Sequence, residues 1–182
     1  MKRNPIFSST SRKKKFTWWQ GALFLIAASI LGRLSGGDPQ QSDEQYESQK
    51  TPPWSPPSWL FGVAWPLNNI ALIWAALRLL NSPKRFPNRQ PLLRLQGVHW
   101  LIFVTFGWVY FRKRSPWLAA LWTQGDALVA LRSYQLAREG DKQLARAYLP
   151  LNIWTWYAST VAWYQALYNP DPLLDTPALL EE

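Results

Sequence analysis

A proline- and tryptophan-rich turn leads directly into a long apolar segment at residues 51–80, TPPWSPPSWLFGVAWPLNNIALIWAALRLL. Proline suits the first turn of a helix, whose backbone amides lack partners, so we expect Ser55 to cap the helix and Pro56 to begin it. Between Pro56 and the end of this segment the only charged residue is Arg78. About 25 helical residues span roughly 37 Å, which is enough to cross a bilayer. The segment therefore predicts a membrane-spanning helix over residues 56–80.

Four other apolar segments have the length of helices, and turns rich in Pro, Gly or charged residues separate them. The five predicted helices cover residues 18–34, 56–80, 92–111, 116–137 and 145–168. Together they predict an all-α integral membrane protein, a bundle of five transmembrane helices over residues 17–168. The first helix is short and follows basic residues, so a cleaved signal peptide is the alternative to a retained helix.

Charged residues concentrate outside the predicted helices. A basic tail at residues 1–16 is predicted to be disordered, residues 35–51 form a polar loop, and an acidic tail covers residues 169–182. Basic residues are also dense after the second and fourth predicted helices, and cytoplasmic loops carry such an excess. We therefore predict a multi-pass protein whose N-terminus is cytoplasmic. The cationic cluster at residues 112–114 lies on the opposite side and conflicts with this orientation.

Composition excludes several kinds of site. The chain has no cysteine and one histidine, so a disulfide, a thiolate nucleophile and a metal site built from cysteines or several histidines are excluded. His99 is expected to be a hydrogen-bonded structural residue rather than a metal ligand. Asp126 is the only carboxylate within a predicted span, and intramembrane charges are functional candidates by default. The net charge of +9 lies on tails and loops, which indicates membrane topology and no nucleic-acid partner.

Two aromatic motifs stand out, PPWSPPSWLFGVAW at the second predicted helix and LPLNIWTWYAS in the fifth. These motifs resemble the TspO/MBR family, the tryptophan-rich sensory proteins of bacteria that are related to the mitochondrial translocator protein. The positions that match the family pattern are Pro52, Trp54, Pro56, Pro57, Trp59, Phe61, Trp65, Pro150 and Trp154. The five-span layout agrees over residues 18–168. Gln45, Asn69 and Ala162 stand where the family has Trp, Tyr and Asn, so the chain resembles a divergent member.

The resemblance implies a pocket among the five helices, covered by the first loop and suited to porphyrins or other flat apolar ligands. It implies an integral membrane receptor or carrier for a tetrapyrrole, linked to stress or pigment regulation, with no required cofactor. Trp65 and Trp154 would stack on the ligand, and Ala158 leaves space beside the Trp154 ring. The candidate ligand-binding residues are Tyr46, Trp54, Phe61, Trp65, Asn69, Trp154, Tyr157 and Ala158. A tryptophan belt at the membrane interface, together with helix packing, is the alternative interpretation.

Two other function classes are consistent with the sequence. Some family members are proposed to degrade porphyrin with light and oxygen through paired tryptophans, but Gln45 replaces one of that pair, so the sequence favours binding over enzyme activity. A membrane scaffold or assembly factor without a ligand is the third class. The family also implies a homodimer, although no GxxxG motif in the predicted spans supports one. The sterol-binding pattern of animal members lacks its cation after Tyr164.

Overall fold

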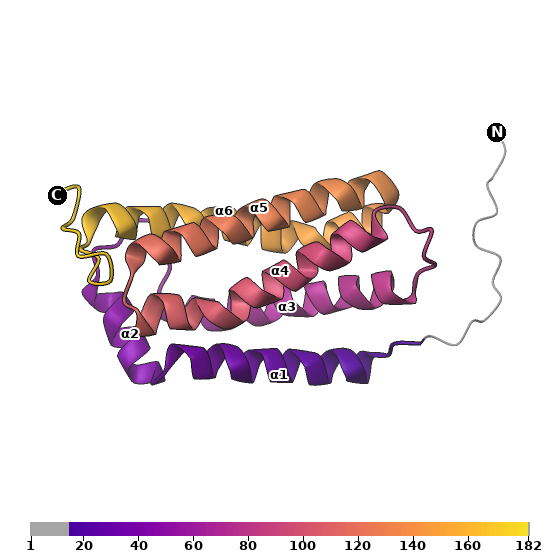
Figure 1. The fold of residues 1–182 in the computed structure, drawn as a ribbon, viewed down its shortest axis with the longest axis horizontal. Helices are drawn as coiled ribbons and strands as arrows, with labels where there is room; N and C mark the ends of the chain where they lie inside the picture. Colours follow the sequence, from indigo (N-terminus) through magenta and orange to yellow (C-terminus); the bar gives the residue numbers. More distant parts are fainter. Residues whose placement is uncertain (1–14, 182) are drawn as a thin grey trace.

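The computed structural model describes residues 15–181, in which most helices run side by side along one axis (Figure 1). In chain order they are α1 (Trp18–Gly36), α2 (Pro39–Ser48), α3 (Ser58–Asn81), α4 (Arg89–Gly107), the π-helical turn η1 (Trp108–Arg112), α5 (Pro116–Gly140) and α6 (Lys142–Tyr168). The described residues contain no β-strand, only one isolated bridge between Asp171 and Thr176. The all-α fold is confirmed, and the five predicted helices are present with ends shifted by three residues at most.

Two helical segments are long and apolar enough to cross a membrane, α3 and the continuous helix formed by α4 and η1. The other long helices do not reach the same apolarity. The outer surface of α1 is nevertheless strongly apolar. Gly21 and Ala28 are the only buried residues of this helix, so its large apolar side chains are left on the outside. Its exposed large side chains are Trp18, Trp19, Leu23, Phe24, Ile26, Ile30, Leu31 and Leu34.

Helices α5 and α6 form an antiparallel hairpin whose buried positions are mostly small, which lets helices approach closely. Their buried alanines are Ala119, Ala120, Ala127, Ala130, Ala137, Ala145, Ala162 and Ala166. Asp141 joins the two helices, caps α6 by accepting from Gln143 N at 2.8 Å, and pairs with Arg78 Nε of α3 at 2.6 Å. Burial raises the pKa of Asp141, but the hydrogen bonds from Arg78 and two backbone amides outweigh it and hold the pKa below its ordinary value of 3.8.

The prediction of a polar loop over residues 35–51 was wrong in one respect, because this stretch contains helix α2. Asp38 caps the helix by accepting a hydrogen bond from Gln40 N at 2.9 Å, and Pro39 occupies the first helical turn. These are the residue types that favour a helix start. Helix α2 lies across one end of the bundle, beyond the end of α1 (Figure 1).

The expected start of the second predicted helix at Ser55 and Pro56 was also wrong. Helix α3 begins at Ser58, with Pro57 in an extended conformation before it. The cause is the Pro-Pro sequence, since a residue that precedes proline is disfavoured in the helical region. Ser55 is therefore free of the helix, and its hydroxyl lies 2.5 Å from the Tyr46 hydroxyl of α2.

A pair of glycines, Gly36 and Gly107, brings the backbones of α1 and α4 into close contact. A Cβ atom on Gly107 would lie 2.6 Å from the Gly36 backbone nitrogen and 2.6 Å from the Ser35 hydroxyl. Immediately after Gly107 the helix widens into the π-helical turn η1, which buries Val109 and Tyr110. Such π turns are frequent at functional sites.

We expect Gly107→Ala to destabilise the bundle by about 1–3 kcal/mol, because the added methyl group must push the α1 backbone away from α4. Gly97→Ala is the matched control, since the same helix has open space around that position. Alanine is the better helix former, so this control should be neutral or more stable by about 0.5–1 kcal/mol. Thermal unfolding of both variants in detergent micelles measures the difference. Equal stability of the two variants would contradict a close α1–α4 contact.

Candidate ligand cavity

A cavity of about 460 Å³ lies between the helices of the bundle, and α2 borders it at one end of the bundle. Helices α1, α3, α4, α5 and α6 all contribute to its wall, which is mainly apolar and aromatic. Six of the predicted ligand-binding residues line it: Tyr46, Phe61, Trp65, Asn69, Tyr157 and Ala158. The structure therefore gathers side chains from α2, α3 and α6 around a single space.

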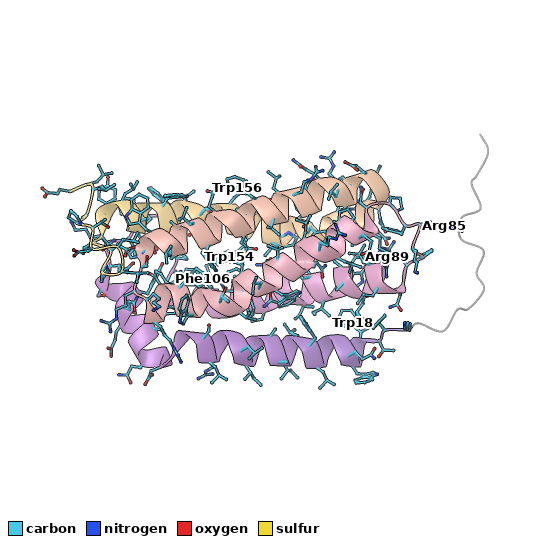
Figure 2. All side chains as sticks on the ribbon, in the orientation of Figure 1. Trp18, Arg85, Arg89, Phe106, Trp154 and Trp156 are labelled. Carbon is cyan, nitrogen blue, oxygen red and sulfur yellow. The ribbon has the colours of Figure 1, made fainter. Side chains whose placement is uncertain are left out.

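Trp154 lies behind the cavity wall and supports the rings that form it. Its ring centroid is 6.4 Å from that of Trp65, at 86°, and 5.6 Å from that of Phe61. Figure 2 places Trp154 within the bundle, whereas Trp156 of the same helix lies at the outer surface. The Trp65 ring also packs against Phe103 of α4, with the ring centroids 5.6 Å apart. Trp65 and Phe103 line the cavity, whereas Trp154 does not.

The structure places Trp54 outside the cavity. Its side chain is 52% exposed, and its indole nitrogen donates to the Thr160 hydroxyl at 3.1 Å. The Trp54 carbonyl accepts a hydrogen bond from the Tyr157 hydroxyl at 2.7 Å. Trp54 thus ties the segment before α3 to α6, and it positions the cavity residue Tyr157 rather than lining the cavity.

Helix α2 closes one end of the cavity and is fastened to three other elements. The Tyr46 hydroxyl donates to the Pro56 carbonyl at 3.0 Å, and its ring meets Phe61 edge-on at 5.4 Å. Burial raises the pKa of Tyr46, and the hydrogen bond with Ser55 partly offsets that rise, so the hydroxyl stays neutral at ordinary pH. Gln45, which stands in place of the family tryptophan, donates to the Tyr110 carbonyl of η1 at 2.7 Å.

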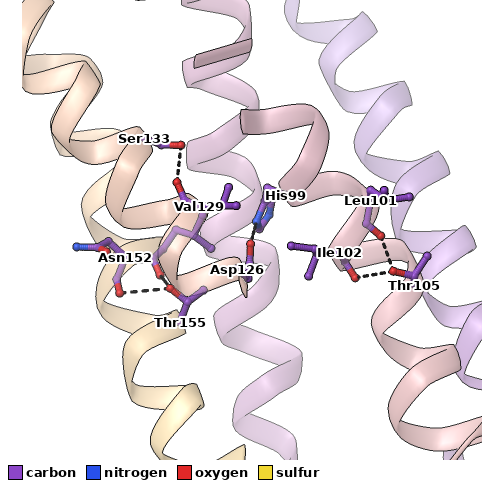
Figure 3. Close-up of polar contacts among 10 residues, drawn as sticks. His99, Leu101, Ile102, Thr105, Asp126, Val129, Ser133, Asn152 and Thr155 are labelled. Atoms are coloured by element: carbon purple, nitrogen blue, oxygen red, sulfur yellow. Dashed lines mark hydrogen bonds and ion pairs between the residues drawn. The ribbon is translucent and has the colours of Figure 1, made fainter. Parts of the chain in front are cut away.

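A buried histidine–aspartate pair adjoins the cavity. His99 Nδ1 of α4 lies 2.6 Å from Asp126 Oδ1 of α5, and the two residues are 1% and 2% exposed (Figure 3). This short contact is a hydrogen bond between the imidazole ring and the carboxyl group. Asp126 lines the cavity, while His99 Nε2 has no hydrogen-bond partner among the described residues. Sequence reasoning singled out both residues, but the pairing depends on the register of two helices.

Sequence reasoning missed the polar residues near α2. Arg33, in the last turn of α1, lines the cavity, as do Tyr110 and Gln165. The Tyr110 hydroxyl lies 3.0 Å from Gln49 Oε1 and 3.3 Å from Gln165 Oε1. Gln165 Nε2 is buried and has no hydrogen-bond partner within residues 15–181. No feature of the sequence marks these residues, because each is a single polar group at the end of an apolar helix.

The match to a known family covers the region that builds this cavity. A family model described as the TspO/MBR family matches residues 21–167, from the first turn of α1 to the last turn of α6. No curated protein matches the chain. The aromatic motifs of α3 and α6, the helical fold and this match over most of the sequence agree with one another. The chain belongs to the TspO/MBR family.

Proposed function

We propose that this chain is a multi-pass membrane protein that binds a flat, tetrapyrrole-like ligand in the cavity between its helices. The observation that carries the proposal is the cavity itself, about 460 Å³ and walled by Trp65, Phe61 and Phe103. Ligand pockets usually enclose about 300–1,000 Å³ and are lined by apolar and aromatic side chains with a few polar groups. Aromatic walls suit a planar ring system, because they contact it over a large area.

The membrane arrangement that we propose has five spans, α1, α3, α4 with η1, α5 and α6. The exposed apolar surface of α1 supports it, since lipid is the solvent in which such a surface is stable. Helices α5 and α6 are less apolar because they carry polar residues that line the cavity, among them Asp126, Thr123 and Gln165. Polar groups in spanning helices typically face the interior of the bundle in this way.

The orientation that we propose places the start of α1 in the cytoplasm. The basic residues of the α3–α4 loop lie at the same end of the bundle as Trp18, as Figure 2 illustrates for Arg85 and Arg89. The cations around this end include Lys84, Arg85, Arg89, Arg138, Lys142 and Arg146. Cytoplasmic loops carry an excess of Lys and Arg, which supports this direction.

Titration with protoporphyrin IX tests the binding function through quenching of tryptophan fluorescence. We expect saturable quenching by the detergent-solubilised protein, and Trp65→Phe should weaken the affinity about two- to tenfold through lost stacking. Trp19→Phe is the control, because Trp19 is 62% exposed on α1 and should leave the affinity unchanged. Linear quenching that is the same in all three proteins would mean partition into micelles and would contradict the proposal.

The same titration separates the other two function classes. Light-dependent bleaching of bound porphyrin would favour a degrading enzyme. Intact folding of Trp65→Phe with no binding to lose would favour a membrane scaffold.

A further inference from the structure

One end of the bundle, where the α3–α4 loop meets the α5–α6 turn, carries exposed cations that no carboxylate neutralises. These cations, called the cationic platform below, are Lys84, Arg85, Arg138, Lys142 and Arg146. Glu139 and Asp141 are the nearby carboxylates in sequence, and both are engaged. Glu139 accepts from Asn88 Nδ2 at 2.7 Å, and Asp141 pairs with Arg78 while capping α6. No ion pair within residues 15–181 involves a member of the platform.

The α3–α4 loop and the α5–α6 turn are fastened to each other, so the cations stand on one continuous surface. Asn88 Nδ2 of the loop also donates to the Leu136 carbonyl of α5 at 3.1 Å. Gly140, at the end of α5, packs so closely on the loop that a Cβ atom there would lie 2.9 Å from the Pro87 Cβ. The cationic platform is thus built from two connections that hold each other in place, which keeps its charges close together.

Exposed tryptophans indicate the depth at which the platform lies in a membrane. Trp18 and Trp19, at the start of α1, are 53% and 62% exposed. Tryptophan favours the interface between the hydrocarbon and water, at the level of the lipid headgroups. Figure 2 shows Trp18 at the same end of the bundle as Arg85 and Arg89. In the membrane arrangement proposed above, the platform therefore lies beside the phosphate groups of one leaflet.

The opposite end of the bundle has a different balance of charge. Acidic residues of α2 and of the segment after α6 gather there, namely Asp38, Asp43, Glu44, Glu47, Asp171, Asp175 and Glu181. The cations at that end, among them Lys50 and Lys113, share it with these acids. Water solvates charges of either sign, so solvation alone does not explain why one end is cationic. A negatively charged membrane surface does attract such a cluster of Lys and Arg.

We propose that the cationic platform binds the headgroups of anionic phospholipids in the leaflet that surrounds the start of α1. Lys and Arg side chains form charge-assisted hydrogen bonds with phosphate oxygens. A headgroup with net negative charge is attracted to the platform, whereas the neutral headgroup of phosphatidylcholine carries a cation of its own that is repelled. The inference rests on the membrane arrangement and orientation proposed above, and it is independent of what the cavity binds.

The test titrates the full chain in detergent with phosphatidylglycerol or with phosphatidylcholine of the same acyl chains, and native mass spectrometry counts the bound lipids. We expect phosphatidylglycerol to bind at least about fivefold more tightly, and the difference to shrink as ionic strength rises. Equal binding of the two lipids would overturn the inference. Binding of hexaglutamate without a preference for phosphatidylglycerol would overturn it in favour of an acidic protein partner.

Two double variants then locate the contact. Lys84→Gln with Lys142→Gln removes one cation from each connection of the platform and should weaken phosphatidylglycerol about fivefold to thirtyfold, with phosphatidylcholine changed by less than about twofold. Lys50→Gln with Lys113→Gln is the matched control, because it removes two exposed lysines from the opposite end of the bundle and should leave both affinities unchanged. Equal weakening by the two double variants would show a response to net charge alone and would overturn the assignment to the platform.

Two further measurements keep the outcomes separable. Thermal unfolding without added lipid should be the same for both double variants, since all four lysines are exposed. The protoporphyrin IX titration should also be the same for both, because none of these lysines lines the cavity. Loss of phosphatidylglycerol preference with unchanged porphyrin binding therefore concerns the platform, and loss of porphyrin binding concerns the proposed function.

Discussion

Replacing His99 with leucine should lower the free energy of unfolding by about 3–5 kcal/mol, one of the two largest effects that we expect in this chain. Leucine fills much of the imidazole volume but donates no hydrogen bond, so Asp126 loses its 2.6 Å partner. Both residues are almost fully buried, and a buried polar group without its hydrogen-bond partner is costly. Urea or thermal unfolding in detergent micelles, followed by circular dichroism, measures the loss.

The double variant His99→Leu with Asp126→Leu separates the lost bond from lost packing. Replacing both members of a buried pair with apolar residues is often close to neutral, so we expect the double variant to recover most of the stability that the single variant loses. A single variant that is no less stable than the double variant would show that the carboxylate does not depend on His99.

The positions of the five long helices could be predicted because each is a mainly apolar segment with Pro, Gly or charged residues at its ends. Helix α2 could not be predicted in this way. Its sequence, PQQSDEQYES, carries a single large apolar side chain, Tyr46, so it has no apolar stripe to recognise. Its stability comes from the Asp38 cap and from contacts made through Tyr46 and Gln45, which only the folded chain reveals. The π-helical turn after Gly107 likewise has no sequence signature here.

The candidate site was predicted in part, through residues that share the family motifs. Phe61 and Trp65 line the cavity as the resemblance implied, because they follow the same turn as in the family. Trp54 belongs to the same motif and Trp154 to the second one, yet neither lines the cavity, since Trp54 hydrogen-bonds to α6 and Trp154 packs against Trp65. The distinction depends on which way each ring points, and a motif does not specify that direction. The His99–Asp126 pair joins two different helices, and periodicity within one helix does not reveal such a pair.

The segment after α6 was expected to be an acidic tail, and Asp171 gives part of it a structural role. Asp171 is 1% exposed and bridges this segment to the start of α5. Its Oδ2 accepts from the Ser115 hydroxyl at 2.5 Å and from Trp117 N at 3.1 Å. Its Oδ1 accepts from the backbone amides of Leu173 and Leu174, each at 3.0 Å. A carboxylate at the N-terminus of α5 also interacts favourably with the helix dipole.

Asp171→Ala should therefore destabilise the protein by about 3–4 kcal/mol, because it removes four hydrogen bonds to a charged group and leaves the buried Ser115 hydroxyl without its acceptor. Asp175→Ala is the control within the same segment. Asp175 is exposed and makes no comparable set of bonds, although its backbone φ of 51° adds a cost for alanine that Asp175→Asn avoids. Thermal unfolding compares the three variants. A loss at Asp171 no larger than at Asp175 would show that α5 does not need this carboxylate.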